Sequence, residues 1–333
     1  MAIRFSSTGL VVGEDTRFSL PAFVDAILRG VGQVMLMNNA WTGLLFLAGI
    51  FLNSALFGAA ALLGTAVSTA TALLLGADRA SIRDGLFGFN GGLVAIALLY
   101  FLEPNPLTWG CVVFAAAGST IVMAAMASLL DTWKVPALTA PFVFTSLCFF
   151  LATARFGRLE TTNLLPTAGL PQTAAVEGVV TAATVGEGLF NGIAQVFFQG
   201  SLLTGIVFAI GLLVGSWRAC VAALAGSLVG ILVAWGMGAA EPAIRAGAFG
   251  FNSVLVAIAF GAVFLAPGRG ATFAYALLAT IATPVVFAAV SAALEPLGVP
   301  ALTLPFVLVT WLFLFASQRF LGLSRAAAKD SPH

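Results

Sequence analysis

The chain has 333 residues, of which 60% are hydrophobic and only 8% are charged, with a formal net charge of +1. Average soluble proteins carry about a quarter charged residues, so this composition excludes an ordinary soluble enzyme and predicts an all-α polytopic membrane protein. The near-neutral charge also leaves no basic face for a nucleic-acid partner.

Residues 1–17 are polar and charged, so they predict a cytoplasmic tail and not a cleavable signal peptide. Basic residues before the first long apolar stretch and after position 318 favour both termini on the cytoplasmic side of a plasma (inner) membrane. Arg155 and Arg158, in the middle of the chain, oppose that charge bias. The expected partner of all the apolar surface is the lipid bilayer.

Uncharged apolar stretches of the length needed to cross about 30 Å of hydrocarbon recur along the chain. They occupy residues 44–77, 107–130, 202–217 and 271–294, and we expect several of them to be long enough to fold back as two spans. Two shorter apolar segments, 87–100 and 249–265, are bounded by acidic residues, prolines or glycines. Such short segments predict re-entrant or broken helices, which membranes tolerate where the backbone lines a cavity.

Three motifs occur twice, in the same order. Residues 30–43, GVGQVMLMNNAWTG, correspond to residues 192–205, GIAQVFFQGSLLTG, at an offset of 162 positions. Residues 87–97, FGFNGGLVAIA, correspond at the same offset to residues 249–259, FGFNSVLVAIA. Residues 135–143, VPALTAPFV, correspond to residues 299–307, VPALTLPFV, at an offset of 164. Ordered repetition at nearly constant spacing indicates a duplicated chain.

The duplication predicts two homologous membrane repeats, at residues 18–156 and 180–320. Residues 157–179 form an exposed linker between them, and residues 321–333 form a second cytoplasmic tail. We expect about five membrane-spanning helices in each repeat, together with re-entrant or tilted half-helices. An odd number of spans requires the second repeat to be inverted, and inverted repeats place a central pore and its substrate site where the halves meet.

Each half supplies four uncharged side chains at these motifs: an amide, a phenylalanine, a leucine and a threonine. They are Gln33, Phe89, Leu93 and Thr139 in the first half, and Gln195, Phe251, Leu255 and Thr303 in the second. A path without charge suits a small neutral solute, and aromatic walls suit a flat one. Urea meets that description, because it is planar and its N–H groups could donate to amide and hydroxyl oxygens that replace water.

The prolines around the two threonines carry a further expectation. Pro136 and Pro300 are expected in the first turn of a helix, where a missing N–H is harmless. Pro141 and Pro305 then fall inside the helix and free a carbonyl group one turn earlier. An exposed row of oxygen acceptors is the predicted result.

Ionisable residues near a membrane require an explanation. Asp131 and Glu295 lie four residues before the repeated VPALT sequence, and we expect them at a helix start, which favours negative charge. Asp25 and Glu187 lie eight residues before the two glutamines and could gather solute at a vestibule, cap a helix or couple protons.

The same residues also have purely structural interpretations. The threonines could bond back to their own helices, the glutamines could join neighbouring helices, and the phenylalanines, including Phe87 and Phe249, could pack in the core. For Asn90 and Asn252 we favour the structural interpretation, in which each amide ties a broken helix to its neighbour.

The cysteines and the histidine give no sign of a metal or cofactor. Cys111, Cys148 and Cys220 lie in apolar runs without paired spacing, and the only histidine is His333. Packing explains such cysteines better than a disulfide or a metal site. We therefore expect no cofactor and no histidine relay in the membrane.

The doubled VPALTxPF element, the GFN element and the segment RGVGQV at 29–34 resemble the urea transporter family, over about residues 18–320. The resemblance implies a channel-like protein for passive, selective conduction of urea, and not an enzyme. It also implies a homotrimer with one pore inside each protomer.

Carried over residue by residue, the family's midplane constriction falls on the two threonines and the two leucines. These are Thr139, Thr303, Leu93 and Leu255, with Leu36, Val196 and Phe198 nearby. The two amide-binding slots fall on Gln33 with Phe89 and on Gln195 with Phe251. Some family members have a carboxylate at the glutamine positions, so the match is to the neutral version. A second slot wall, often aromatic in the family, is Leu86 here and only Ala248 in the other half.

Two other functions stay open on the sequence. A facilitator could carry another small neutral solute, such as ammonia or a short amide, although the lack of an intramembrane histidine argues against ammonia. A non-transporting membrane scaffold would have no need for paired polar residues at matching positions, which this chain has.

Overall fold

The computed structural model describes residues 4–11, 19–172, 175–266, 270–320 and 322–323. Within these ranges the chain is helical apart from loops and one short hairpin, so the all-α class is confirmed. The hairpin, formed by β1 (Arg4–Ser6) and β2 (Gly9–Val11), lies in the segment predicted as a tail. It packs against the helices, because the Trp41 indole N–H donates to the Ser6 carbonyl at 3.0 Å.

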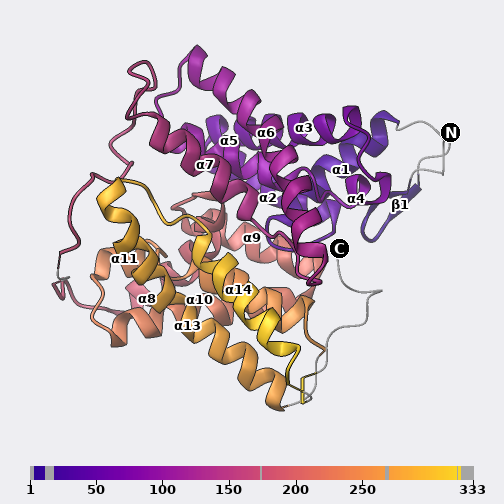
Figure 1. The fold of residues 1–333 in the computed structure, drawn as a ribbon. Coiled ribbons are helices and arrows are strands. Elements are labelled where there is room, and N and C mark those ends of the chain that lie inside the picture. The colour runs from indigo at the N-terminus through magenta and orange to yellow at the C-terminus, as the bar shows by residue number, and fades with distance from the viewer. Residues whose placement is uncertain (1–3, 12–18, 173–174, 267–269, 321, 324–333) are drawn as a thin grey trace.

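The described part of the chain forms two successive series of seven α-helices, coloured from indigo to yellow in Figure 1. The first series is α1 (Leu20–Gln33), α2 (Ala40–Asn53), α3 (Ala55–Leu74), α4 (Arg79–Arg83), α5 (Phe89–Phe101), α6 (Pro106–Asp131) and α7 (Ala140–Ala152). The second is α8 (Ala182–Ala194), α9 (Leu202–Gly215), α10 (Trp217–Gly236), α11 (Glu241–Arg245), α12 (Phe251–Ile258), α13 (Gly270–Leu294) and α14 (Leu304–Ser317). Single turns η1 (Gln195–Phe197), η2 (Ala259–Val263) and η3 (Glu295–Leu297) extend α8, α12 and α13.

Four helices of the described chain are long and apolar enough to cross a membrane alone: α3, α6, α10, and α13 with its extension η3. A fifth span results if α8 and α9, which meet at a bend of 75°, count as one. The other apolar helices have 10–17 residues, which is shorter than the roughly 20 residues of a full span. The number of five spans in each repeat therefore stays a prediction.

The long apolar stretch at 44–77 is broken into α2 and α3 at Ser54. The Ser54 backbone is extended, with φ −153° and ψ 114°, and its hydroxyl accepts a hydrogen bond from the Phe57 amide, as an N-cap residue does. Ser216 makes the equivalent bond to the Ala219 amide at the start of α10. A serine at the same place in each half thus starts a long helix.

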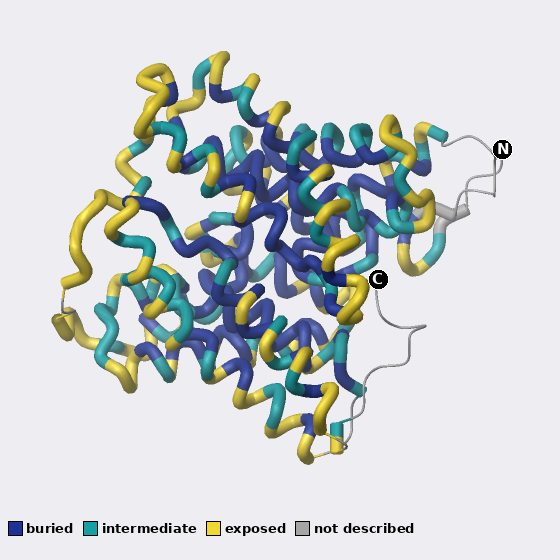
Figure 2. Tube along the Cα trace, viewed as in Figure 1, coloured by how far each residue is buried: buried dark blue, intermediate teal, exposed yellow. Residues whose placement is uncertain are grey.

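The short helices α5 and α12 are buried along nearly their whole length, and Figure 2 shows that the buried residues gather in the middle of the molecule. Every residue of α5 except Tyr100 is buried. Small residues allow this close packing, since a Cβ added at Gly64 of α3 would collide with the Gly91 carbonyl of α5. In the second half, a Cβ added at Gly226 of α10 would lie 2.5 Å from the Ser253 carbonyl oxygen of α12.

The two halves contact each other through α2 and α9. The Thr42 hydroxyl donates to the Gly211 carbonyl at 2.8 Å, and the Thr204 hydroxyl donates to the Gly49 carbonyl at 3.3 Å. The two donors are 162 residues apart in sequence, and so are the two acceptors, so each half makes the same hydrogen bond to the other. Reciprocal contacts of this kind characterise a two-fold interface.

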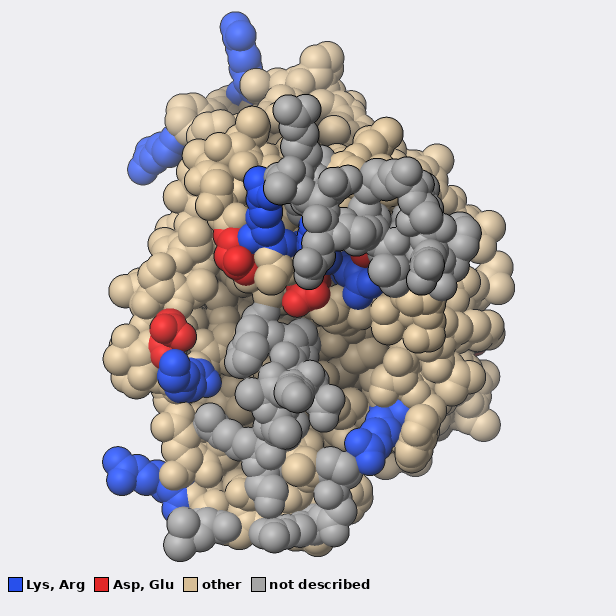
Figure 3. Space-filling model, turned by 90° about the vertical axis from the view of Figure 1, so that its right-hand side faces the viewer, with Lys and Arg blue, Asp and Glu red and all other residues tan. Residues whose placement is uncertain are grey.

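The outer faces of the long helices expose large apolar side chains. Phe114 of α6 is 72% exposed and Phe273 of α13 is 71% exposed. Soluble proteins rarely expose extended apolar surface, whereas contact with hydrocarbon accounts for it. On the face in Figure 3, several charged side chains gather in the upper middle, a few others lie near the edges, and the rest of the visible described surface is uncharged.

The expectation for the prolines is wrong. Pro141 and Pro305 occupy the first turns of α7 and α14, where a proline fits without breaking the helix. Pro136 and Pro300 lie in the non-helical loops before them. The carbonyl groups of residues 137 and 301 accept turn hydrogen bonds from the amides of residues 140 and 304, so the predicted row of open acceptors does not form.

The expectation for Asp131 and Glu295 is also wrong. Asp131 is the last residue of α6, and Glu295 begins the turn that follows α13. Both acids therefore lie at helix C-termini, where the helix dipole disfavours negative charge. Asp131 is exposed and pairs with Lys134 at 3.7 Å.

The linker lies at the left edge of Figure 1, on the side of the molecule opposite the hairpin and the C-terminal end of α14. Parts of it pack against the helices. Thr161 pairs with Leu102 as an isolated β-bridge, and the Gly169 amide donates to the Glu295 carbonyl at 3.2 Å. The linker thereby reaches the second half of the chain before the second series of helices begins.

Candidate functional site

Five described residues other than glycine have a positive φ, and four of them lie within the repeated motifs. Leu36 and Phe198, at 62° and 60°, follow Gln33 and Gln195 by three residues, while Leu138 and Leu302, at 54° and 52°, directly precede the two threonines. This conformation costs about 1–2 kcal/mol for a residue with a side chain, and such strain clusters at functional sites. The loops that carry it occur at matching positions of both halves.

Thr139 and Thr303 are the N-cap residues of α7 and α14, but neither side chain caps its own helix. Their hydroxyl oxygens lie 2.6 Å apart and share a hydrogen bond between the two halves. Both residues are buried, at 2% and 3% exposure. A single polar pair therefore joins the two loops within an apolar surround, and neither hydroxyl makes the alternative bond back to its helix.

Asn90 and Asn252 hold these loops in place. The Asn90 side chain donates to the Leu138 carbonyl at 3.4 Å and accepts from the Phe142 amide at 3.1 Å. Asn252 makes the equivalent two bonds in the second half, at 3.2 and 3.1 Å. Each amide thus ties a short central helix to the loop with the left-handed leucine, and the structural interpretation of both asparagines is confirmed.

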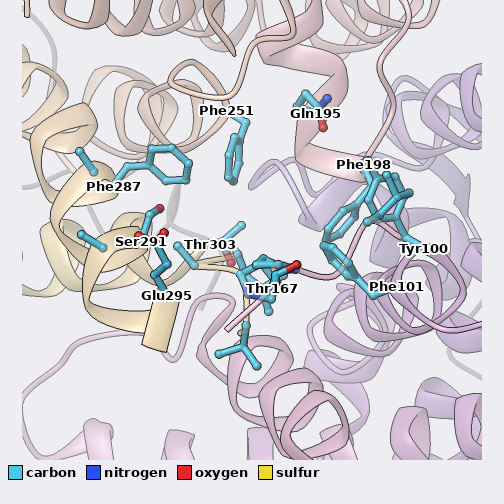
Figure 4. Close-up of a pocket in the computed structure, with 18 of the residues that line it drawn as sticks. Tyr100, Phe101, Thr167, Gln195, Phe198, Phe251, Phe287, Ser291, Glu295 and Thr303 are labelled. Atoms are coloured by element: carbon cyan, nitrogen blue, oxygen red, sulfur yellow. The ribbon is translucent and has the colours of Figure 1, made fainter. Parts of the chain in front are cut away.

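A cavity of about 720 Å³ extends from Thr303 into the second half of the chain (Figure 4). Phe251 and Phe287 border it on one side, with ring centroids 5.6 Å apart and planes at 81°. Phe198 borders it on the other side and is stacked at a tilt against Tyr100, at 5.3 Å. The space between the two aromatic groups is therefore flanked by rings from both halves.

Polar side chains line the same cavity. Gln195 and Thr303 are joined there by Ser291 of α13, by Glu295 of the turn η3, and by Thr167 and Gln172 of the linker. In the described part of the chain, the Gln195 side-chain amide has no hydrogen-bond partner, so both its donor and its acceptor groups are available to a solute.

Gln33 is placed differently from its counterpart. It is only 3% exposed, and its side-chain N–H donates to the Asp84 carbonyl at 2.8 Å. This bond fixes the amide and leaves its oxygen and its second N–H without a partner among the described residues. The two glutamines therefore occupy matching positions in the fold but differ in accessibility.

The predicted site residues fall into two groups. The cavity lining includes five of them: Gln195, Val196, Phe198, Phe251 and Thr303. The other seven are not among the described residues that line this cavity: Gln33, Leu36, Leu86, Phe89, Leu93, Thr139 and Leu255. Leu93 and Leu255 are fully enclosed, at 0% exposure. The structure joins the two groups directly at the threonine pair.

The acidic residues before the glutamines lie in ion pairs outside the cavity lining. Asp25 bonds to Arg29 at 2.6 Å. Glu187 bonds to Arg245 at 2.9 Å, and Arg245 also bonds to Glu241 at 2.7 Å. In this cluster, the Thr184 hydroxyl and then the Arg245 guanidinium lower the pKa of the Glu241 carboxyl. The paired arrangement favours a structural role for these acids over proton coupling.

Several cavity residues were missed by sequence reasoning. Phe287 lies in a uniform apolar helix, and the residue 164 positions earlier is Met123, so repetition gave no signal. Phe287 supplies the aromatic neighbour of Phe251 that the small Ala248 cannot. Thr167 could have been found only as a polar residue of a linker that has no counterpart in the repeat.

The site offers uncharged hydrogen-bonding groups between aromatic walls, with Glu295 as its one acidic group. Such a surface can hold a flat neutral solute by stacking and by hydrogen bonds to its edge. Within the described ranges, no three His, Cys, Asp or Glu side chains come together as a metal site requires.

Comparison with known proteins gives a consistent set of matches. A family model described as "Urea transporter" matches residues 24–318. "Urea transporter 1" of Rattus norvegicus is 32% identical over 296 residues, which cover 88% of this chain and 76% of that protein. "Urea transporter 1" of Ovis aries is 32% identical over 301 residues, covering 89% and 78%, and that of Mus musculus is 30% identical over 327 residues, covering 95% and 84%.

Proposed function

The chain belongs to the urea transporter family, and we propose that it carries urea passively across a membrane along a path between its two halves. It is a helical, multi-pass membrane protein whose transport function follows from that family. The observation that supports the path is the Thr139–Thr303 hydroxyl pair at the end of an aromatic cavity that contains Gln195.

We propose that the cavity is one of two urea-binding slots. Stacking against Phe251 would hold the flat face of urea, while its N–H groups donate to the Gln195 side-chain oxygen and the Thr303 hydroxyl. Each such bond replaces a bond to water, so desolvation is offset without a deep energy minimum, as conduction requires.

The constriction then lies at the threonine pair. Urea that passes it exchanges the Thr139–Thr303 hydrogen bond for bonds to itself, so the hydroxyls alternate between each other and the solute. Leu93 and Leu255 form the apolar walls of this narrow part, with Leu36, Val196 and Phe198 nearby. Beyond it, Gln33 and Phe89 form the second slot, with Leu86 as its further wall.

We further propose that the halves are inverted repeats, at residues 18–156 and 180–320. The reciprocal threonine bonds between α2 and α9 support a two-fold relation. The position of the linker opposite the hairpin and the end of α14 supports an odd number of crossings in each half. The resemblance to the family supports a homotrimer in the plasma (inner) membrane with cytoplasmic termini and no catalytic role.

Urea flux into liposomes with the purified protein tests the proposal. Light scattering after rapid mixing should report urea flux far above that of empty liposomes, without a sodium or pH gradient. Thiourea and dimethylurea should compete. Gln195→Leu should lower the flux several-fold, because it removes a cavity-lining amide that has no partner among the described residues.

Gln318→Leu is the matched control, since Gln318 is exposed near the end of α14 and is not among the cavity-lining residues. Its flux should equal that of the unchanged protein. A requirement for an ion gradient would contradict passive conduction, and equal flux in both glutamine variants would contradict the proposed slot. Faster permeation of ammonia than of urea would support the alternative solute.

A further inference from the structure

A second kind of cavity lies on the outer surface, away from the proposed urea path. It is a groove of about 460 Å³ between the start of α6 and the end of α7. Its walls are the apolar side chains of Leu107, Cys111 and Phe149, and its rim carries Arg155 and Arg158. An apolar groove with a positive rim has the form of a lipid site.

The two arginines have no role in the fold that would explain them. Both are exposed, and neither forms an ion pair with a described residue. Glu160, two residues after Arg158, accepts at its backbone carbonyl from the Glu103 amide at 2.9 Å, and neither acid is among the residues lining the groove. Two guanidinium groups therefore remain available at the edge of an apolar surface.

The duplication provides an internal comparison. An equivalent groove of about 500 Å³ lies between α13 and α14, and its lining matches the first at an offset of 164. There Tyr275 replaces Cys111 and bonds to the Phe313 carbonyl at 2.6 Å, while Gly322 replaces Arg158. The second groove thus carries a tyrosine in place of the cysteine and no arginine among its described lining residues.

We propose that the groove between α6 and α7 binds an anionic phospholipid, with one acyl chain along Leu107, Cys111 and Phe149 and the phosphate on Arg155 and Arg158. Guanidinium groups match phosphate oxygens in geometry and charge, and long basic side chains reach the membrane interface while their stems cover apolar surface. The proposal also explains the two arginines that oppose the charge bias of the termini.

Native mass spectrometry and thermal unfolding of the purified, detergent-solubilised full chain test the proposal. The probes are phosphatidylglycerol and phosphatidylcholine with identical acyl chains. The unchanged protein should bind phosphatidylglycerol about 10-fold more tightly or better, since each basic residue at an anionic lipid contributes to binding. The preference should disappear in Arg155→Gln/Arg158→Gln.

Arg319→Gln is the matched control, because Arg319 follows Arg155 by 164 residues but is not among the residues lining the second groove. It should keep the full preference. Cys111→Trp should fill the apolar part of the groove and weaken both lipids, which separates acyl-chain binding from phosphate binding.

Equal affinity for the two lipids in the unchanged protein would overturn the proposal, and so would a preference that persists in the double arginine variant. If glycerol phosphate alone stabilises the protein as much as phosphatidylglycerol does, the site is one for a soluble phosphate and not for a lipid. If the arginine variants change the oligomeric state without changing lipid binding, the groove is a contact between copies of the chain.

Discussion

The hydrogen bond between Thr139 and Thr303 allows a prediction that tests the contact between the two halves. We expect Thr139→Val and Thr303→Val each to destabilise the protein. The double variant should be at least as stable as the less stable of the two single variants. In each single variant a buried hydroxyl loses its partner, whereas the double variant removes both polar groups and keeps their volume. Leaving one partner of a buried hydrogen bond unsatisfied costs more than removing both.

The magnitude follows from the surroundings of the pair. Each hydroxyl has the other as its only hydrogen-bond partner among the described residues. Loss of such a bond in a membrane protein costs about 0.6–1.7 kcal/mol. Thr303 lines the cavity and Thr139 is not among its described lining residues, so water can reach Thr303 when Thr139 is replaced. Thr303→Val should therefore be the more destabilising single change.

The assay is a double-mutant cycle on unfolding in mixed micelles of a mild detergent and dodecyl sulfate. The double variant should be more stable than the sum of the single changes predicts, by about 1–2 kcal/mol. Additive effects would refute the reasoning, because they would mean that neither hydroxyl depends on the other. A larger effect for Thr139→Val would refute the argument from water access.

Three further predictions use other parts of the structure. Gly43→Ala should abolish the yield of monodisperse protein in size-exclusion chromatography, because a Cβ there would overlap the Leu28 carbonyl, while Gly118→Ala, with open space around it, should have no effect. Asn252→Ala should lower the free energy of unfolding by about 2 kcal/mol, since it leaves two buried backbone groups without partners; unchanged thermal unfolding would contradict this. The fold lowers the pKa of Glu241, so the charged carboxylate stabilises the folded protein at pH values above the ordinary pKa of a glutamate. This stabilisation is lost as the pH falls through the pKa that Glu241 has in the folded protein. The unfolding temperatures of the unchanged protein and of Glu241→Gln should therefore converge below about pH 4.

The sequence predicted the helical class because composition and apolar run length depend little on tertiary detail. The stretches at 107–130 and 271–294 coincide with α6 and α13. The prolines were misplaced because a proline five residues after another can belong either to the interior or to the first turn of a helix. That choice depends on where the helix begins. Each helix begins two residues after a residue in the left-handed conformation, Leu138 or Leu302, and the local sequence pattern does not specify that conformation.

For the candidate site, repetition identified those residues that occur in both halves. It identified the two threonines, which bond to each other in the structure, and the two asparagines, which bond to the loops that carry these threonines. Repetition could not identify Phe287, Tyr100 or the linker, because each contributes to the cavity from one half only. It also could not distinguish Gln33 from Gln195, since their difference arises from a tertiary hydrogen bond to the Asp84 carbonyl.

That difference constrains how the proposed pathway can work. Urea at Gln33 meets the amide oxygen and one remaining N–H, because the other N–H is bonded to the Asp84 carbonyl, whereas urea at Gln195 meets an amide without a partner among the described residues. The two slots therefore differ in affinity, but a passive path cannot convert that difference into net transport without a gradient. Multi-site conduction requires each site to release its solute readily, so a weaker slot at one end favours release there. The asymmetry should thus affect the concentration at which flux saturates from each side, and leave the equilibrium distribution of urea unchanged.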